Sequence, residues 1–166
     1  ERWARLAQSR LAAAGRRLIV IPGEGDPPEM GEAFAASSST LWAPSGVARL
    51  DERRELVCQG PAGADHDDGV RPEQALTASL EASIETAGEV YESVFALHLP
   101  PQTTEEAGGN GPSAWPETAR QVFRRAIETF QPLLSLHGGW EGDWWSRRIG
   151  RTQCLAPGAA CEDGLL

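Results

Sequence analysis

The stretch that decides the fold is LTASLEASIETAGEVYESVFALHL, residues 76–99. A two-residue turn at Ala87-Gly88 lets the residues before it pair with those after it as an antiparallel hairpin. One face of this hairpin is then apolar and the other mostly polar, which is typical of a sheet that covers a core. We therefore predict a β-hairpin here. Its apolar face holds four cross-strand pairs: Ile84 with Tyr91, Leu80 with Phe95, Ala78 with Leu97, and Leu76 with Leu99.

A helix over residues 72–87 is the alternative for the first half of this stretch. Pro72 would stand near the helix start, and Gly88 would stop the helix. The apolar residues before the turn also share one helical face. We prefer the hairpin because its register match extends over four apolar pairs, and a helix here would remove any barrel built on that hairpin.

Short helices and strands are expected on both sides of the hairpin. Residues 40–43 and 47–50 form a second predicted hairpin, joined by a turn at 44–46. Pro132 is expected to bend the last helix. The remaining predicted elements are helices at 2–17, 29–36 and 116–136, strands at 18–21, 55–59 and 140–149, and an irregular tail from residue 156.

Together these elements predict an α+β fold, in which an antiparallel sheet or partial barrel has flanking N-terminal and C-terminal helices. The length of 166 residues suits a single domain. Within it we expect an N-terminal helix and extension at 1–39, an antiparallel sheet region at 40–99, a linker loop at 100–116, and a helix, Trp-rich strand and tail at 117–166.

Composition argues against several classes of partner. The net charge is −9, and residues 18–116 hold seventeen acidic residues against four Arg. Such an acidic chain repels nucleic acid and anionic lipid, so we expect neither as a partner. No apolar run is longer than four residues, the length of residues 18–21, which is too short for a transmembrane span. All fifteen basic residues are Arg, and the chain begins at Glu1, so we expect a processed protein from a GC-rich genome.

No motif in the sequence predicts a reaction. Residues 18–25 are similar to a strand that leads into a Gly-rich phosphate loop, but the third glycine is not in place and Asp26 puts charge where phosphate would sit. The histidines His66, His98 and His137 are isolated, without zinc-type spacing to cysteine. We therefore predict no catalytic residues and no cofactor-dependent chemistry.

One acidic loop is a candidate for a cation site. It gathers oxygen and nitrogen ligands but lacks the spacing and the distal Glu of a calcium loop, so a solvated turn is the expected structure. Its candidate ligands are Asp65, His66, Asp67 and Asp68. Of the three cysteines, Cys154 and Cys161 are close enough in sequence for a disulfide, although three ordinary thiols, Cys58 included, are the expected state.

Three of the six tryptophans lie in one segment, residues 140–145. On a strand, Trp140 and Trp144 share one face, and we expect both to anchor the core. Trp145 falls on the other, polar face. It is either a core anchor or part of an interface or an aromatic ligand pocket, and the sequence leaves both open.

Residues 139–144, Gly-Trp-Glu-Gly-Asp-Trp, resemble the Gly-x-Trp first strand of lipocalin-like (calycin) barrels, a group that includes phycobiliprotein chromophore-lyase relatives. Residues 40–47 and 84–95 resemble later strands of such a barrel, so the sheet would be permuted. The resemblance implies an antiparallel barrel that holds a lipophilic molecule or a pigment. The residues that would line it are Leu80, Tyr91, Phe95 and Trp144.

The leading hypothesis from the sequence is a non-catalytic accessory subunit that docks on other protein subunits of a larger organellar complex. A photosynthetic complex, in a chloroplast and peripheral to a membrane, is favoured. The expected interface residues are Arg2, Arg10, Arg16, Arg17, Trp145, Arg147 and Arg148. A lipocalin-like binder of a lipophilic molecule is the second hypothesis. An enzyme that uses His66 or His98 beside a carboxylate or thiol is the third.

Overall fold

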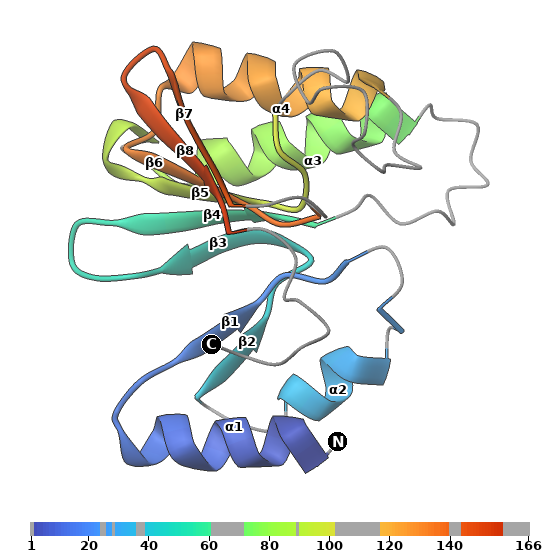
Figure 1. The fold of residues 1–166 in the computed structure, drawn as a ribbon, viewed down its shortest axis with the longest axis vertical. Helices are drawn as coiled ribbons and strands as arrows, with labels where there is room; N and C mark the ends of the chain where they lie inside the picture. The colour runs from blue at the N-terminus through green and yellow to red at the C-terminus, as the bar shows by residue number, and fades with distance from the viewer. Residues whose placement is uncertain are drawn as a thin grey trace.

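The computed structural model describes residues 2–23, 26–27, 29–35, 39–60, 72–88, 90–101, 117–139 and 144–157. Among the helices in these ranges, none has the length and apolar character needed to cross a bilayer. The chain divides into an N-terminal part, a six-stranded sheet, and two helices that cover one face of that sheet (Figure 1).

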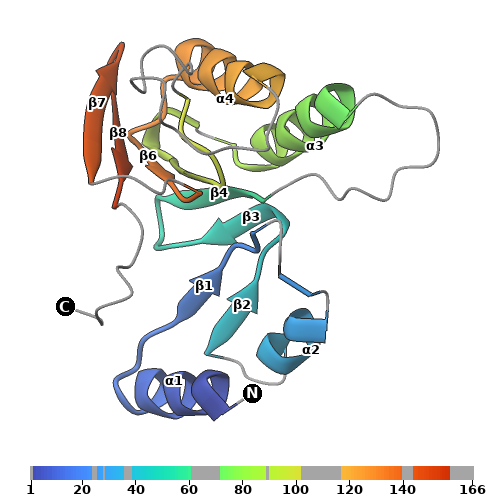
Figure 2. The same ribbon diagram turned by 45° about the vertical axis from the view of Figure 1, so that its right-hand side comes forward.

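The N-terminal part pairs two short strands in parallel. It comprises α1 (Arg2–Ala13), β1 (Leu18–Val20), α2 (Glu29–Ala35) and β2 (Thr40–Trp42), and β1 pairs with β2 in parallel. Gly15 ends α1 in the left-handed conformation, with φ of 63°. This lets the backbone N–H of Arg16 donate to the carbonyl of Leu11 at 2.9 Å. Both views place α1 and α2 at the end of the molecule far from the two large helices (Figures 1 and 2).

The main sheet is mixed and open, with strand order β3-β4-β5-β6-β8-β7. Its four inner strands, β4, β5, β6 and β8, run parallel to one another, and the edge strands β3 and β7 are antiparallel. Their bounds are β3 (Ser45–Arg49), β4 (Glu55–Gln59), β5 (Val94–Leu97), β6 (Leu134–His137), β7 (Trp145–Ile149) and β8 (Thr152–Ala156).

Helix α3 (Pro72–Thr86) links β4 to β5, after which the short 3₁₀ helix η1 (Val90–Glu92) leads into β5. Helix α4 (Glu117–Phe130) links β5 to β6. Both helices lie on the same face of the sheet (Figures 1 and 2). Consecutive parallel strands are added here in one direction across the sheet, and the crossover helices that join them are right-handed. Such helices lie together on one face of the sheet. The principal core fills the space between them and the sheet, and its largest members are Leu76, Leu80, Phe95, Leu97, Phe123 and Ile127.

The opposite face of the sheet carries a second apolar cluster. It is built on alternate residues of the same strands, among them Leu56 and Cys58 of β4 and Ala96 of β5. Ile19 and Ile21, from β1 and the segment after it, pack against this cluster. The sheet is therefore apolar on both faces, as its parallel inner strands require.

The predicted hairpin at residues 76–99 is wrong, and the helix alternative is correct. Residues 72–86 form α3, with Pro72 at its first position, and β5 pairs with β4 and β6 in parallel. Leu80 and Phe95 meet in the core as helix against sheet and not as cross-strand partners. The α+β class is confirmed, whereas the antiparallel sheet region at 40–99 and the partial barrel are not, because the sheet is open and mixed.

Three smaller expectations are also corrected. Residues 40–42 and 45–49 are strands but do not pair with each other, since β2 pairs with β1 and β3 with β4. The last predicted helix ends at Phe130, because Gln131 adopts φ of 49° and Pro132 follows, and the chain then enters β6. Residue 156, where the irregular tail was expected to begin, is the last residue of β8, which is inserted between β6 and β7.

Candidate functional site

The carboxyl ends of the parallel strands gather polar residues at one edge of the sheet. His98 follows the last residue of β5, and His137 is the last residue of β6. The two strands are neighbours, with Leu97 paired to His137. In open α/β sheets, ligands bind at this edge, where the loops that follow the strands leave room for them.

His137 is held in one orientation by the segment after β5. Its side chain is buried, and Nδ1 lies 2.8 Å from the carbonyl oxygen of Leu99. A carbonyl oxygen only accepts, so Nδ1 carries the proton and Nε2 is left as an acceptor. Burial lowers the pKa of His137 to about 4, although the bond to Leu99 acts in the other direction. The imidazole is therefore neutral at physiological pH.

His98 is enclosed by glycines from two loops. A Cβ atom at Gly23, just after β1, would lie 3.3 Å from Cε1 of His98. A Cβ at Gly139 would lie 2.7 Å from the His98 carbonyl oxygen, a distance that real side chains do not show. Gly139 also has φ of 58°. Both glycines thus allow the backbone to pass close to His98.

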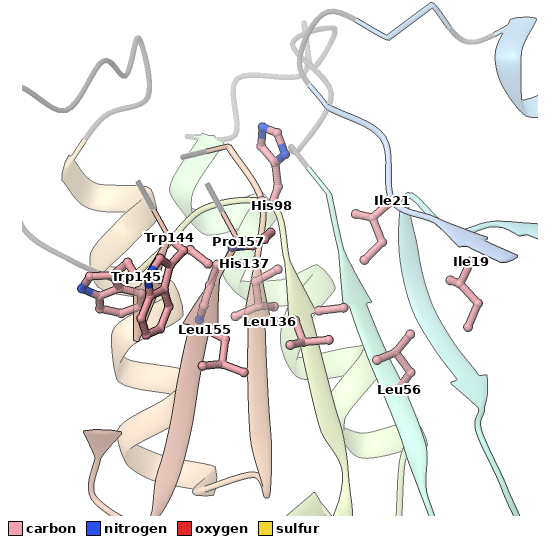
Figure 3. A pocket seen from close by; sticks show the side chains of 14 residues that line it. Ile19, Ile21, Leu56, His98, Leu136, His137, Trp144, Trp145, Leu155 and Pro157 are labelled. Atoms are coloured by element: carbon pink, nitrogen blue, oxygen red, sulfur yellow. The ribbon is translucent and has the colours of Figure 1, made fainter. Parts of the chain in front are cut away.

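A cleft of about 690 Å³ runs along this edge and over the sheet face that carries the second apolar cluster (Figure 3). Figure 3 shows His98 at one end of it, the two tryptophans on one side, and Ile19 and Ile21 on the other. Among the described residues, those that line the cleft are mostly apolar, with two histidines, and Asp, Glu and Arg are absent from this part of the lining. The principal apolar lining residues are Ile19, Ile21, Leu56, Leu136, Trp144 and Leu155.

Of the three predicted ligand-lining residues whose side chains are described, one lies at this cleft. Trp144 lines the cleft and is 71% exposed, so it is not the core anchor that its strand position suggested. Leu80 and Phe95 are buried in the core between the helices and the sheet. Tyr91 belongs to η1, and its side chain lies outside the described residues, as does Trp140.

The predicted interface residues fall into two separate groups, one in or just after α1 and the other on β7 (Figure 1). Arg10, Arg16 and Arg17 are exposed in or after α1, and Arg17 donates from Nη2 to the carbonyl of Arg49 at 2.6 Å. The side chain of Arg2 lies outside the described residues. The second group lies on β7, where Trp145 is half-buried and Arg147 and Arg148 are exposed.

Trp145 contacts the histidine of the cleft. Its ring meets that of His137 edge-on, with centroids 6.3 Å apart and an angle of 73° between the planes. It also packs against the principal core. The core packing agrees with the core-anchor role that the sequence left open. Trp145 also lines the cleft, and its role in an interface or a ligand pocket stays a prediction.

The weak cation candidates Asp65, His66, Asp67 and Asp68 lie outside the described residues, and so does Cys161. Within the described ranges, no group of three or more His, Cys, Asp or Glu side chains has the spacing to hold a metal ion. Cys58 and Cys154 are free thiols, and burial raises the pKa of each to about 11.

Sequence reasoning missed His137 as a site residue because the last helix was extended to residue 136. The signal was nevertheless present. Pro132 interrupts the helix, four mostly apolar residues follow, and His137 then precedes Gly138-Gly139. A short apolar run that ends in a polar residue and two glycines is typical of a buried parallel strand and the loop after it.

Comparisons with known proteins show the fold and not a family. No family model matches the chain, and no curated protein matches it either. A solved crystal structure is similar with TM-score 0.62 and 16% identity over 93% of this chain, which spans 62% of the length of that protein. The crystal structure of TT1561 of Thermus thermophilus is similar with TM-score 0.59 and 18% identity, over 95% of this chain and 69% of that one. The arrangement of helices and strands thus recurs in longer proteins.

Proposed function

We propose that this protein binds a neutral, largely apolar small molecule in the cleft at the carboxyl edge of its sheet. The observation that carries the proposal is the cleft itself, about 690 Å³ in volume and lined by apolar side chains with two histidines. Sites for small molecules have volumes of roughly 300–1,000 Å³ and combine apolar walls with a few polar groups. The sequence-based expectation of a lipophilic ligand is kept in this proposal. The site is now a cleft on an open sheet, and not the interior of a barrel.

The absence of charged lining residues sets the charge of the ligand. A buried carboxylate or ammonium group requires a partner of opposite charge, and neither Asp, Glu, Lys nor Arg lines the cleft among the described residues. A neutral molecule loses much less solvation on entering. The exposed ring of Trp144 adds apolar surface that a ligand would cover.

Titration with the neutral fluorescent probe N-phenyl-1-naphthylamine tests this proposal. We expect saturable enhancement of fluorescence with the native protein. Leu136→Glu places a carboxylate in the cleft at a side chain that is 39% exposed, so folding should survive while binding weakens at least about tenfold. Leu133→Glu is the matched control, because Leu133 is 52% exposed and does not line the cleft. Equal binding by both variants would contradict the proposal.

Docking on a larger complex is the second candidate function. It is favoured by Trp144, 71% exposed beside the edge strand β7, with Arg147 and Arg148 exposed on that strand. Aromatic and Arg side chains are enriched at protein interfaces. Its placement in a photosynthetic organellar complex stays a prediction of the sequence. Co-purification from the native source should retain a partner chain that Trp144→Ser releases and Leu41→Ser, equally an exposed apolar site, does not. Recovery as a monomer would contradict docking.

A further inference from the structure

In the part of the chain that the structure describes, strand β1 has a neighbouring strand on one side only. The N–H of Leu18 donates to the carbonyl of Ser39 at 2.8 Å. The carbonyl of Val20 accepts from the N–H of Ala43 at 2.9 Å, so both strand residues bond toward β2. Because the backbone groups of successive strand residues point to opposite sides, the N–H and C=O of Ile19 point away from β2. They form what we call the open edge of β1.

The open edge borders the cleft. Ile19 and Ile21 line the cleft, whereas β2 contributes none of its described lining residues. Both ribbon views place β2 farther than β1 from β7 and β8 (Figures 1 and 2). The side chain of Ile19 packs on the second apolar cluster of the main sheet. The backbone groups of Ile19 therefore lie at the rim of the cleft, beside an apolar floor.

The floor of the cleft beyond β1 is an apolar sheet face that is only partly covered. Leu136 of β6 and Leu155 of β8 are register partners, and Leu136 is 39% exposed. Figure 3 shows both between the tryptophans and the two isoleucines, and Trp144 is itself 71% exposed. Parallel strands are normally covered on both faces, and here α3 and α4 cover the other one. This half of the sheet thus offers a surface for a further layer.

We propose that the ligand of the cleft is an extended peptide segment that adds as a strand to the open edge of β1. Its backbone pairs with the N–H and C=O of Ile19, and its apolar side chains, at alternate positions, pack on Leu136, Leu155 and Trp144. The inference rests on the proposed function and names the class of ligand that the same cleft takes. In recognition by strand addition, main-chain hydrogen bonds give affinity and alternate side chains give specificity.

Complementary charge selects this occupant. Asp, Glu and Arg are absent from the described lining, so a segment with uncharged side chains enters without an unpaired ion. Its amide groups match the donor and the acceptor that Ile19 presents, which an apolar compound without amides leaves unpaired. A second copy of this chain fits less well. Its edge strands β3 and β7 carry the exposed residues Arg49, Arg147 and Arg148, whose charges would meet an uncharged cleft.

Three capped hexapeptides test whether the backbone of the ligand pairs with β1. The parent, acetyl-Thr-Val-Thr-Val-Thr-Val amide, is neutral and has all its valines on one face. One derivative is N-methylated at the valines and the other at the threonines. Since the N–H groups of a strand alternate in direction, one derivative blocks the edge that meets β1 and the other leaves that edge intact. We expect the parent to displace N-phenyl-1-naphthylamine, and the two derivatives to differ at least about tenfold in affinity.

Amide hydrogen exchange, followed by NMR in the native protein, locates the pairing. The N–H of Ile19 should exchange readily without peptide and become protected at saturating parent peptide. The N–H of Leu18 is the internal control, because its bond to Ser39 protects it in both states. Leu136→Glu should weaken binding of the parent peptide at least about tenfold, and Leu133→Glu should leave it unchanged.

Several outcomes overturn the inference and leave the proposed function standing. They are a parent peptide that does not displace the bound fluorescent probe, equal affinities of the two methylated peptides, and an Ile19 N–H that stays unprotected at saturating peptide. Protection of Ile19 before any peptide is added also overturns it, and a dimer in sedimentation would then identify a second copy at the open edge. If neither the fluorescent probe nor the peptide binds, the proposed function fails and the inference with it.

Discussion

Nδ1 of His137 lies 2.8 Å from the carbonyl oxygen of Leu99, so the last residue of β6 is hydrogen-bonded to the segment that follows β5. This bond joins the ends of two neighbouring parallel strands at the edge where the cleft opens. It also places a neutral imidazole in a buried position, since burial lowers the pKa of His137 to about 4. The packing of the sheet edge beside the cleft therefore depends on this side chain.

The first prediction concerns pH. The pKa of His137 is about 4 in the folded protein and near 6.5 when the chain is unfolded, so below pH 6.5 the unfolded state binds the additional proton. Its contribution to stability is complete above pH 6.5 and is lost as the pH falls toward 4. We expect the free energy of unfolding of the native protein to fall by up to about 3 kcal/mol more than that of His137→Asn over this range. Urea unfolding at several pH values measures the difference, and parallel curves would contradict it.

The second prediction concerns the close approach of Gly139 to His98. Gly139→Ala adds a Cβ to a backbone with φ of 58° and places it 2.7 Å from the His98 carbonyl oxygen. Gly15→Ala is a matched control, because Gly15 has φ of 63° with open space around it. Strain in the backbone alone costs about 1 kcal/mol, and the collision adds roughly 1–3 kcal/mol. In denaturant unfolding, Gly139→Ala should have a clearly lower free energy of unfolding than Gly15→Ala. Equal losses of free energy in the two variants would show that the backbone at His98 shifts without cost and would contradict the prediction.

The third prediction tests the junction between α4 and β6. The hydroxyl of Thr152, which is fully buried, donates to the carbonyl of Pro132 at 2.7 Å. Thr152→Val keeps the shape but leaves that carbonyl unpaired, and should cost about 1–3 kcal/mol in the free energy of unfolding. Thr86→Val removes a similar bond to Ala82 on the exposed side of α3 and should cost under about 0.5 kcal/mol. If Thr152→Val lost as little free energy of unfolding as Thr86→Val, the buried hydrogen bond between Thr152 and Pro132 would not stabilise this junction.

The fourth prediction concerns the thiols of Cys58 and Cys154. Burial raises the pKa of each to about 11, and the thiolate is the reactive form. In a Cys161→Ser background, we expect neither thiol to react with Ellman's reagent at pH 8 while the protein is folded, and both to react in urea. Counting modified thiols by mass spectrometry checks this. Fast labelling of the folded protein would show that the sheet opens at β4 or β8.

The hairpin error has a physical cause. Leu76, Leu80 and Ile84 recur every four residues, and a spacing of four satisfies both the two-residue period of a strand and the 3.6-residue period of a helix. The four matched pairs across Ala87-Gly88 were therefore compatible with a β-hairpin and with a helix, and could not decide between these two structures. The deciding interactions are long-range: α3 buries that face against Phe95 and α4, which no local pattern records.

The site was predictable only in part. Trp144 could be singled out because several tryptophans in one segment are unusual, and it does line the cleft. Ile19, Leu136 and Leu155 could not be assigned to one site, because they come from β1, β6 and β8 and meet only through the sheet order. That order, with β8 inserted between β6 and β7, is a tertiary property that the short strands do not encode locally.

The central claim is that the cleft at the carboxyl edge is the binding site. Mapping bound N-phenyl-1-naphthylamine by the chemical shifts of labelled methyl groups tests it most directly. We predict that the methyl resonances of Ile19, Ile21, Leu136 and Leu155 move on titration, while those of Leu80 and Ile84 in the core stay in place. Shifts confined to the groove between α3 and α4, where Leu80 and Ile84 also lie, or no shifts at saturating probe, would contradict the claim.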